Sequence, residues 1–378
     1  MEIVFWTSVL VVVYVYAGYP LLLAAWSAAA GRPVRTREDG DPRGWPPVSV
    51  VVAAHNEGAR LRARVANLLE QRYPGSLEVI VVSDGSTDAT RAALTPFDAR
   101  LTFVELPRVG KPAALNAGVA AASGEIIVFA DARQRFAADA VLRLVSNFAD
   151  PDVGGVTGEL VLDCEIDDGS GSTIGEGVGL YWRYEKWLRR HESRVRSTLG
   201  ATGAIYALRR ELWTPLPADT LLDDVLAPIR VVLAGRRIVF DERARAFDRA
   251  APDGSAESRR KTRTLAGNYQ ILWLEPRLLL PVRNPVWLQY LSHKVGRLLV
   301  PWALVAALAA SAVLAADRWL YFVALILQLG FYGLAALGAW MDARERGRTD
   351  ELPARARGGA TRPRHAPRVQ GGTRVKAG

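Results

Sequence analysis

The stretch Glu125–Gln134, EIIVFADARQ, joins an uninterrupted apolar run to a carboxylate. The residues from Ile126 to Ala130 include no polar side chain, which is typical of a strand buried on both faces of a sheet. Asp131 stands where that strand should emerge. Because ligands in open α/β sheets lie outside the carboxyl ends of the strands, Asp131 is a candidate binding residue. The alternative interpretation is that Asp131 caps the helix that follows.

Further apolar runs precede this stretch and alternate with helical patterns. Val48–Ala54, Leu77–Ser83 and Leu101–Glu105 predict three strands. Apolar residues at helical spacing over Leu61–Leu69 predict a helix after the first of them, and another helix should begin near Pro112. This alternation predicts an α/β fold, with a Rossmann-like, mostly parallel sheet and helices on both faces.

The pattern continues less regularly after the Asp131 stretch. Val153–Cys164 and Arg237–Asp241 predict strands, and Leu221 opens a helical pattern. Tyr181–Val195 predicts an amphipathic helix with several aromatic side chains. Packing of this aromatic face on the core is the favoured interpretation, and a platform for stacking sugars is the alternative.

Composition excludes several functional classes. The chain has 378 residues, a net charge of +9, one cysteine and four histidines. Cys164 cannot form an internal disulfide, and so few soft ligands argue against a zinc site. No Walker A or Gly-x-Gly-x-x-Gly motif supports an ATPase or a dinucleotide-binding protein. The basic residues gather beside long apolar runs, so they predict contact with membrane lipids and not with nucleic acid.

The apolar runs predict a membrane protein. Ile3–Ala30 exceeds the roughly 20 residues that a span requires. Six segments result: an N-terminal anchor at 1–30, a basic linker at 31–47, the α/β domain at 48–250, interfacial amphipathic helices at 251–297, two further spans at 298–341 and a basic, disordered tail at 342–378. Because basic loops stay in the cytoplasm, we expect the α/β domain and the tail on the cytoplasmic side of a bacterial inner membrane, and the N-terminus outside.

Polar side chains follow the predicted strands of this sheet. They are Asn56, Glu57, Asp84, Asp88, Lys111 and Asp131. In a parallel sheet the carboxyl ends of the strands meet in one crevice. The carboxylates there can accept hydrogen bonds from a base and a ribose, and Lys111 with a cation bound by Asp131 can neutralise a diphosphate. These residues predict a nucleotide-sugar site.

Four short motifs at these strand ends resemble family 2 glycosyltransferases. They are VVVAAHNE at 50–57, SDGSTD at 83–88, GKPAALN at 110–116 and DAR at 131–133. The family has the GT-A fold, and its membrane-bound branch of cellulose, hyaluronan and poly-N-acetylglucosamine synthases is most similar. The resemblance runs from about Val48 to the last predicted span. Its order and spacing make it far more specific than any one motif.

The resemblance implies a role for each matching residue on the donor side. Glu57 and Asp84 would bind the uridine half of a sugar nucleotide, and Lys111 would lie near its diphosphate. Asp131 would be the first carboxylate of the Asp-x-Asp motif that binds Mg²⁺ or Mn²⁺. Arg133 replaces the second carboxylate, so it would neutralise phosphate directly and leave the metal weakly bound.

On the acceptor side, Leu222-Asp223-Asp224 is similar to the family's Thr-Glu-Asp, which makes Asp224 the general base. The alternative is an acidic pair favoured by the positive end of a helix. Gly203 would let the backbone approach the acceptor, or it forms a tight turn. Gln270 and Trp273 match part of the family's Gln-x-x-Arg-Trp motif, which holds the growing polymer.

The missing Arg of that motif argues against a processive enzyme. Three spans with almost no polar residue also leave no polar path for a polymer through lipid. The sequence therefore predicts an inverting transferase that moves one sugar, from a UDP-sugar, to a lipid-linked or saccharide acceptor in cell-surface polysaccharide or glycolipid synthesis. A processive exopolysaccharide synthase, whose channel a homo-oligomer would form, is one alternative. A non-catalytic, nucleotide-binding membrane scaffold is another.

Overall fold

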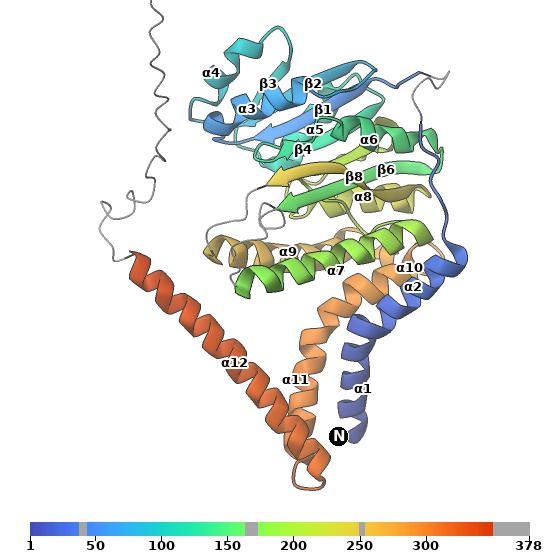
Figure 1. Ribbon diagram of the computed structural model, residues 1–378, viewed down its shortest axis with the longest axis vertical. Coiled ribbons are helices and arrows are strands. Elements are labelled where there is room, and N and C mark those ends of the chain that lie inside the picture. The colour runs from blue at the N-terminus through green and yellow to red at the C-terminus, as the bar shows by residue number, and fades with distance from the viewer. Residues whose placement is uncertain (38–43, 163–172, 249–253, 351–378) are drawn as a thin grey trace, which may run out of the picture. The chain divides into compact units, whose positions relative to one another are not determined.

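The computed structural model describes residues 1–37, 44–162, 173–248 and 254–350. Within them, one eight-stranded sheet has the strand order β3-β2-β1-β4-β7-β6-β8-β5 (Figure 1). The strands are β1 (Val48–Ala54), β2 (Leu77–Asp84), β3 (Thr102–Leu106), β4 (Ile126–Asp131), β5 (Arg135–Phe136), β6 (Val153–Leu162), β7 (Ile205–Arg209) and β8 (Arg237–Asp248). The predicted strands are therefore present, and Cys164 lies outside the described residues.

The sheet is mixed but mostly parallel, because β6 and β8 pair in parallel and run in the same direction as β1 to β4. β1 pairs in parallel with β2 and β4, and β2 pairs in parallel with β3. β7 instead runs antiparallel to β4 and β6, and β5 runs antiparallel to β8. The prediction of a mostly parallel sheet is thus confirmed. The reversed direction of β5 and β7 was not predicted, because the alternation of side chains between two faces is the same for either strand direction.

Helices cover both faces of the sheet. They are α3 (Gly58–Leu69), α4 (Thr90–Leu94), α5 (Lys111–Ala121), α6 (Ala140–Ser146), α7 (Thr173–Val195), α8 (Asp223–Leu233) and α9 (Gly254–Leu274). Val50 and Val52 of β1 pack in one core with α3 and α6. Val51 points the opposite way, into a second core with α5 and α8. Burial on both faces explains why β1 is apolar throughout.

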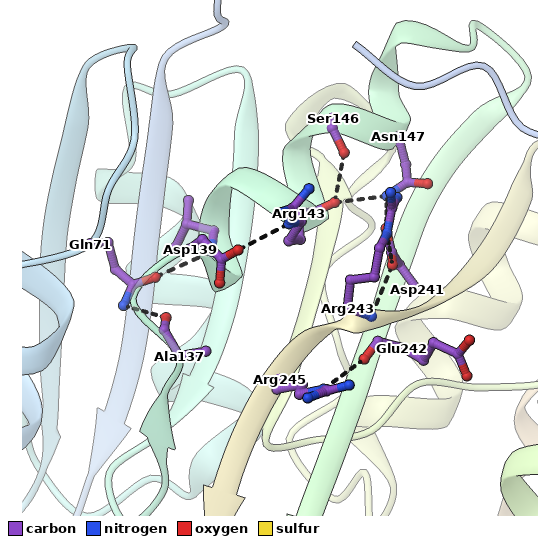
Figure 2. A network of polar contacts seen from close by, with 11 residues as sticks. Gln71, Ala137, Asp139, Arg143, Ser146, Asn147, Asp241, Glu242, Arg243 and Arg245 are labelled. Carbon is purple, nitrogen blue, oxygen red and sulfur yellow. Dashed lines mark hydrogen bonds and ion pairs between the residues drawn. The ribbon is translucent and has the colours of Figure 1, made fainter. Parts of the chain in front are cut away.

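A polar network joins α6 to β8 and fixes the far side of the sheet (Figure 2). The Asn147 amide donates to Asp241 Oδ2 at 2.8 Å, and Arg243 donates to the two oxygens of the same carboxylate at 2.9 and 2.8 Å. Nearby, the Gln71 amide donates to the carbonyl of Ala137 at 2.9 Å. The buried Asp241 is thereby fully hydrogen-bonded, as a buried carboxylate requires.

Among the described residues, three helical segments are long and apolar enough to cross a membrane: Glu2–Ala30, Trp287–Leu314 and Trp319–Gly338. The first consists of α1 (Glu2–Val13), η1 (Tyr14–Gly18) and α2 (Tyr19–Ala30). The second consists of α10 (Trp287–Gln289), η7 (Tyr290–Val295) and α11 (Gly296–Leu314). The third is part of α12 (Trp319–Asp350). Three candidate spans were expected, and three are present.

Two boundaries differ from the predicted ones. The second candidate span begins at Trp287 and not at the predicted residue 298, so the segment from Tyr290 is continuous with it, and its His293 is buried. His293 Nδ1 lies 2.7 Å from Oε1 of the buried Glu192, a pairing that no local pattern reveals. In addition, α12 continues to Asp350, through the first part of the tail predicted from Asp342. Charged residues with high helix propensity favour that extension, and residues 351–378 lie outside the described part.

Candidate active site

The loops after β1 and β2 bind each other at the carboxyl end of the sheet. Thr87 N donates to Asn56 Oδ1 at 2.8 Å, and Asn56 N donates to Ser86 Oγ at 3.1 Å. Asn56 has a φ of 54°, in the left-handed region that Asn tolerates better than most residues. His55 Nδ1 lies 2.7 Å from the carbonyl oxygen of Asp84. The two motif loops therefore form one unit.

The three carboxylates expected to bind the nucleotide have protein partners. Asp84 is buried and its Oδ1 accepts from Val109 N at 2.7 Å and Gly110 N at 2.9 Å. Asp88 accepts from Gly58 N at 3.1 Å, at the start of α3. Glu57 pairs with Arg60 at 3.1 Å. Asp84 and Asp88 thus hold the loops in place through backbone hydrogen bonds. Glu57 differs from them, because its partner is an arginine at the surface.

Lys111 brings two of the expected residues together. It begins α5 directly after Gly110, whose φ of 93° lies in the region that favours glycine. Its Nζ lies 3.0 Å from Asp131 Oδ1 at the end of β4 and 3.2 Å from Asp223 Oδ2 at the start of α8. Burial alone would lower the pKa of Lys111, but Asp223, Asp131 and Asp224 raise it above its ordinary value. The ammonium therefore stays charged between the two motifs.

Arg133 points away from this ion pair toward β8. Its Nη2 lies 2.5 Å from Oδ2 of the buried Asp248, an oxygen that also accepts from the Gln134 amide at 3.0 Å. Half of the Arg133 side chain is exposed, so it can still meet an anion. Arg133, which replaces the second carboxylate of the family motif, thus forms an ion pair with Asp248 that the resemblance did not imply.

Asp224 lies beside the Lys111 ion pair with a different environment. Burial and the neighbouring charge of Asp223 raise the pKa of Asp224 to about 6, against the opposite effect of Lys111. A Cβ built on Gly203 would lie 2.9 Å from Asp224 Oδ2. Gly203 therefore gives room to the candidate base itself, whereas the sequence suggested room for the acceptor. A carboxylate with this pKa is well suited to accept a proton near neutral pH.

Gln270 and Trp273, the two expected acceptor-side residues of α9, behave differently. The Gln270 side chain accepts from Leu221 N at 2.8 Å and donates to the carbonyl of Asp219 at 2.8 Å. It thereby holds the loop that leads into Asp223 and Asp224. Trp273 is 86% exposed and does not join it. Gln270 acts on the candidate base through the backbone.

Several residues near the candidate base were not expected from the sequence. Tyr206 of β7 is buried, and burial together with Asp223 raises its pKa well above the ordinary value, so its hydroxyl remains a donor. Glu192 of α7 and His293 lie 2.7 Å apart and line a cavity that Asp224 also lines. One feature of the sequence could have indicated them: an otherwise apolar helix contains the basic residues His293, Lys294 and Arg297.

The described residues offer limited support for a bound metal. Among them, no group of three or more His, Cys, Asp or Glu side chains could hold an ion. Asp131 is one hard oxygen ligand at the expected position. Since Mg²⁺ is commonly bound by one or two carboxylates together with substrate phosphates and water, a single Asp131 fits such an ion.

Comparison with known proteins matches the motif region. The family model "Glycosyl transferase family 2" matches residues 49–212. An N-acetylglucosaminyltransferase of Rhizobium leguminosarum bv. trifolii is 37% identical over 129 residues, which cover 32% of this chain and 71% of that protein. An N-acetylglucosaminyltransferase of Rhizobium meliloti (strain 1021) is 37% identical over 139 residues, which cover 35% of this chain and 31% of that protein. The match thus spans about a third of that relative's length.

A solved structure extends the likeness to nearly the whole chain. It is the mannosyltransferase PcManGT from Pyrobaculum calidifontis in complex with GDP-Man and Mn²⁺, with a TM-score of 0.64 and 25% identity. The alignment covers 92% of this chain and 100% of that one, and confirms the expected GT-A fold. Together with the family model and the rhizobial relatives, it shows that this chain belongs to the family 2 glycosyltransferases.

Proposed function

We propose that this protein is an inverting glycosyltransferase that moves one sugar from a nucleotide-sugar donor to a lipid-linked or saccharide acceptor at the cytoplasmic face of a membrane. The observation that carries the proposal is the pair Asp223 and Asp224 at the start of α8. Asp223 lies against Lys111, 3.2 Å away, while Asp224 lines a cavity. The two adjacent carboxylates therefore have different environments. This difference suits two roles, with Asp223 on the donor side and Asp224 as the base on the acceptor side.

In this proposal the residues on the donor side bind and orient the nucleotide sugar. Lys111 provides positive charge for the diphosphate, and the exposed part of Arg133 adds to it. The loops held by Asp84 and Asp88 shape the nucleotide pocket, with Glu57 at its edge. Mg²⁺ or Mn²⁺ bound by Asp131 would supply further charge to the leaving diphosphate.

Asp224 acts on the acceptor. Its carboxylate accepts the proton of an acceptor hydroxyl, whose oxygen forms the new bond to the anomeric carbon. The bond from that carbon to the diphosphate breaks on the opposite side, so the configuration is inverted. Gly203 leaves space for the Asp224 carboxylate. Gln270 holds the preceding loop, so that the base keeps its orientation.

The names of the relatives guide the choice of donor. The rhizobial relatives are N-acetylglucosaminyltransferases and the solved neighbour holds GDP-Man. UDP-N-acetylglucosamine is therefore the first donor to test and GDP-Man the second. Membranes containing the full-length protein are incubated with each radiolabelled donor. Label in an extractable lipid is expected, whereas label in high-mass material would indicate a processive synthase. Nucleotide binding without any incorporation would indicate a scaffold.

The Asp224→Asn variant tests the assigned base. Loss of the base should lower transfer by roughly 10²- to 10⁴-fold, while the affinity for the nucleotide stays close to that of the wild type because Lys111 and Asp131 are untouched. Asp219→Asn, in the exposed loop before α8, is the matched control. Near-normal turnover of Asp224→Asn would show that another group accepts the proton.

A further inference from the structure

Asp224 lines a charged cavity, and Lys111 is not part of the wall of this cavity. Its volume is about 160 Å³, and its wall includes Asp224, Arg189 and Lys294. Since one water molecule occupies about 30 Å³ in the liquid, this is room for about five waters or one compact polar group. Arg189 belongs to α7, and Lys294 belongs to the apolar segment Trp287–Leu314.

Two of the three carboxylates of the cavity wall, Glu185 and Glu192, already have close partners. Glu185 pairs with Arg297, with 2.5 Å between Oε1 and Nη1. Glu192 Oε1 lies 2.7 Å from His293 Nδ1 and accepts from the Tyr19 hydroxyl at 2.9 Å. These contacts satisfy both glutamates without the other cations of the wall.

Two cations of the wall remain available. Within the described part of the chain, neither Arg189 nor Lys294 has a carboxylate within 4.0 Å. Arg189 Nη1 donates to Thr202 Oγ1 at 2.6 Å. The Lys294 ammonium interacts with Glu185, Glu192 and Asp224 only at longer range. Of the three carboxylates of the wall, only Asp224 has no ion pair within 4.0 Å to a described residue, so two cations face one unpaired carboxylate. A further anion in this part-buried cavity would therefore be stabilised.

We propose that the acceptor is a membrane lipid whose head group carries a phosphate, and that Lys294 and Arg189 bind this phosphate beside Asp224. The inference rests on the proposed function and names its acceptor class. The segment that carries Lys294 is a candidate membrane span, so a lipid head group can reach the cavity without leaving the membrane surface. A phosphate placed there keeps the acceptor hydroxyl near Asp224, next to Asp223, which contacts Lys111 on the proposed donor side.

The test uses the full-length protein in phosphatidylcholine nanodiscs. Equilibrium binding of radiolabelled dodecyl phosphate is compared with that of dodecanol, which has the same chain without the charge. The phosphate is expected to bind at least about tenfold more tightly, because hydrogen bonds to charged groups contribute that much or more. Lys294→Gln and Arg189→Gln should each weaken its binding by roughly 10- to 100-fold, and Lys294→Arg should largely restore it.

The matched control is Arg190→Gln, one residue along α7, where the exposed Arg190 pairs with Glu242 outside the cavity. This variant should bind dodecyl phosphate like the wild type. Equal affinity for dodecanol, or unchanged affinity in both Gln variants, overturns the proposal. Inorganic phosphate that competes at equal concentration overturns the lipid assignment, because the site would then bind free anions. Binding as expected, in a protein that transfers no sugar from any donor, would leave the phosphate site standing and remove the proposed function.

Discussion

At the scale of single residues, environment separates two adjacent and chemically identical side chains. Asp223 is buried against the Lys111 ammonium, whereas Asp224 lies in a cavity wall where burial and Asp223 raise its pKa to about 6. Such a separation of environments assigns one carboxylate to binding and the other to proton transfer. Gly203 makes this possible because it has no Cβ beside Asp224.

The raised pKa predicts the pH dependence of transfer. Below about pH 6 the Asp224 carboxyl is protonated and cannot accept a proton, and above that pH it is ionised. The value of kcat/KM should therefore rise with pH between about 5 and 7, with half of the maximum near 6. Nucleotide binding measured over the same range is the control. A flat profile between those values would contradict the assignment of Asp224 as the base.

Gly203→Ala tests the space beside the base. The added Cβ would lie 2.9 Å from Asp224 Oδ2, so the carboxylate must shift. We expect kcat to fall on the order of 10- to 100-fold, with a fold that still unfolds cooperatively. Gly330→Ala is the control, because a Cβ there meets nothing within 4 Å. Equal activity of the two variants would show that the position of the Asp224 carboxylate is not limiting.

At the scale of elements, α9 holds the loop that precedes α8. Gln270 bonds to the backbone at Leu221 and Asp219, and Arg263 Nη2 donates to the carbonyl of Leu221 at 2.8 Å. α9 therefore has two roles. It covers the second hydrophobic core, and it positions the loop that precedes the candidate base. This contact explains the part of the Gln-x-x-Arg-Trp motif that the chain retains. Gln270 bonds to the backbone of the loop, whereas Trp273 is exposed.

Gln270→Leu should therefore lower kcat more than it lowers stability. It removes two hydrogen bonds to the loop, about 1–3 kcal/mol of folding free energy in total, and frees the segment that carries the base. Gln71→Leu is the matched control, because the Gln71 amide also bonds to the backbone, at Ala137 and Val141, and makes no hydrogen bond to a described residue of the candidate site (Figure 2). Thermal unfolding and steady-state kinetics of both variants give the comparison. Similar losses of kcat in both would mean that general destabilisation explains the effect.

At the scale of the molecule, the N-terminal apolar segment packs against the α/β domain and forms a hydrogen bond with it. Tyr19 and Leu23 of α2 pack with Leu188 and Val195 of α7, and the Tyr19 hydroxyl donates to Glu192. α7 also contacts β8 and contributes Arg189 to the cavity. The same helix thus connects the candidate membrane anchor, the sheet and the proposed acceptor site.

Tyr19→Phe tests that connection. The buried Glu192 would lose a donor, which should cost about 1–3 kcal/mol and lower the unfolding temperature of the full-length protein in nanodiscs. Tyr16→Phe, where half of the side chain is exposed, should leave that temperature nearly unchanged. If the two variants unfold at the same temperature, the contact between α2 and α7 does not stabilise the domain.

The sequence by itself determined the α/β class, the strands of the motif half, the three apolar segments and the family. These features are encoded locally, since side-chain periodicity, apolar length and motif spacing are all properties of neighbouring residues. It also indicated that Lys111 and Asp131 lie close together, because parallel strand ends share one edge. The resemblance to the family added Asp223-Asp224 to the same site, where Asp223 contacts Lys111.

Only the tertiary structure decided the direction of β7, the use of Asp84 to hold Val109 and Gly110, and the pairing of Arg133 with Asp248. Each depends on a partner far along the chain, which the periodicity of a segment does not specify. The charged residues around His293 are a further case in which the local pattern does not specify a distant partner. Their pattern suggested a membrane surface, whereas the fold places His293 against Glu192, about a hundred residues away, because a buried charge must find an opposite partner.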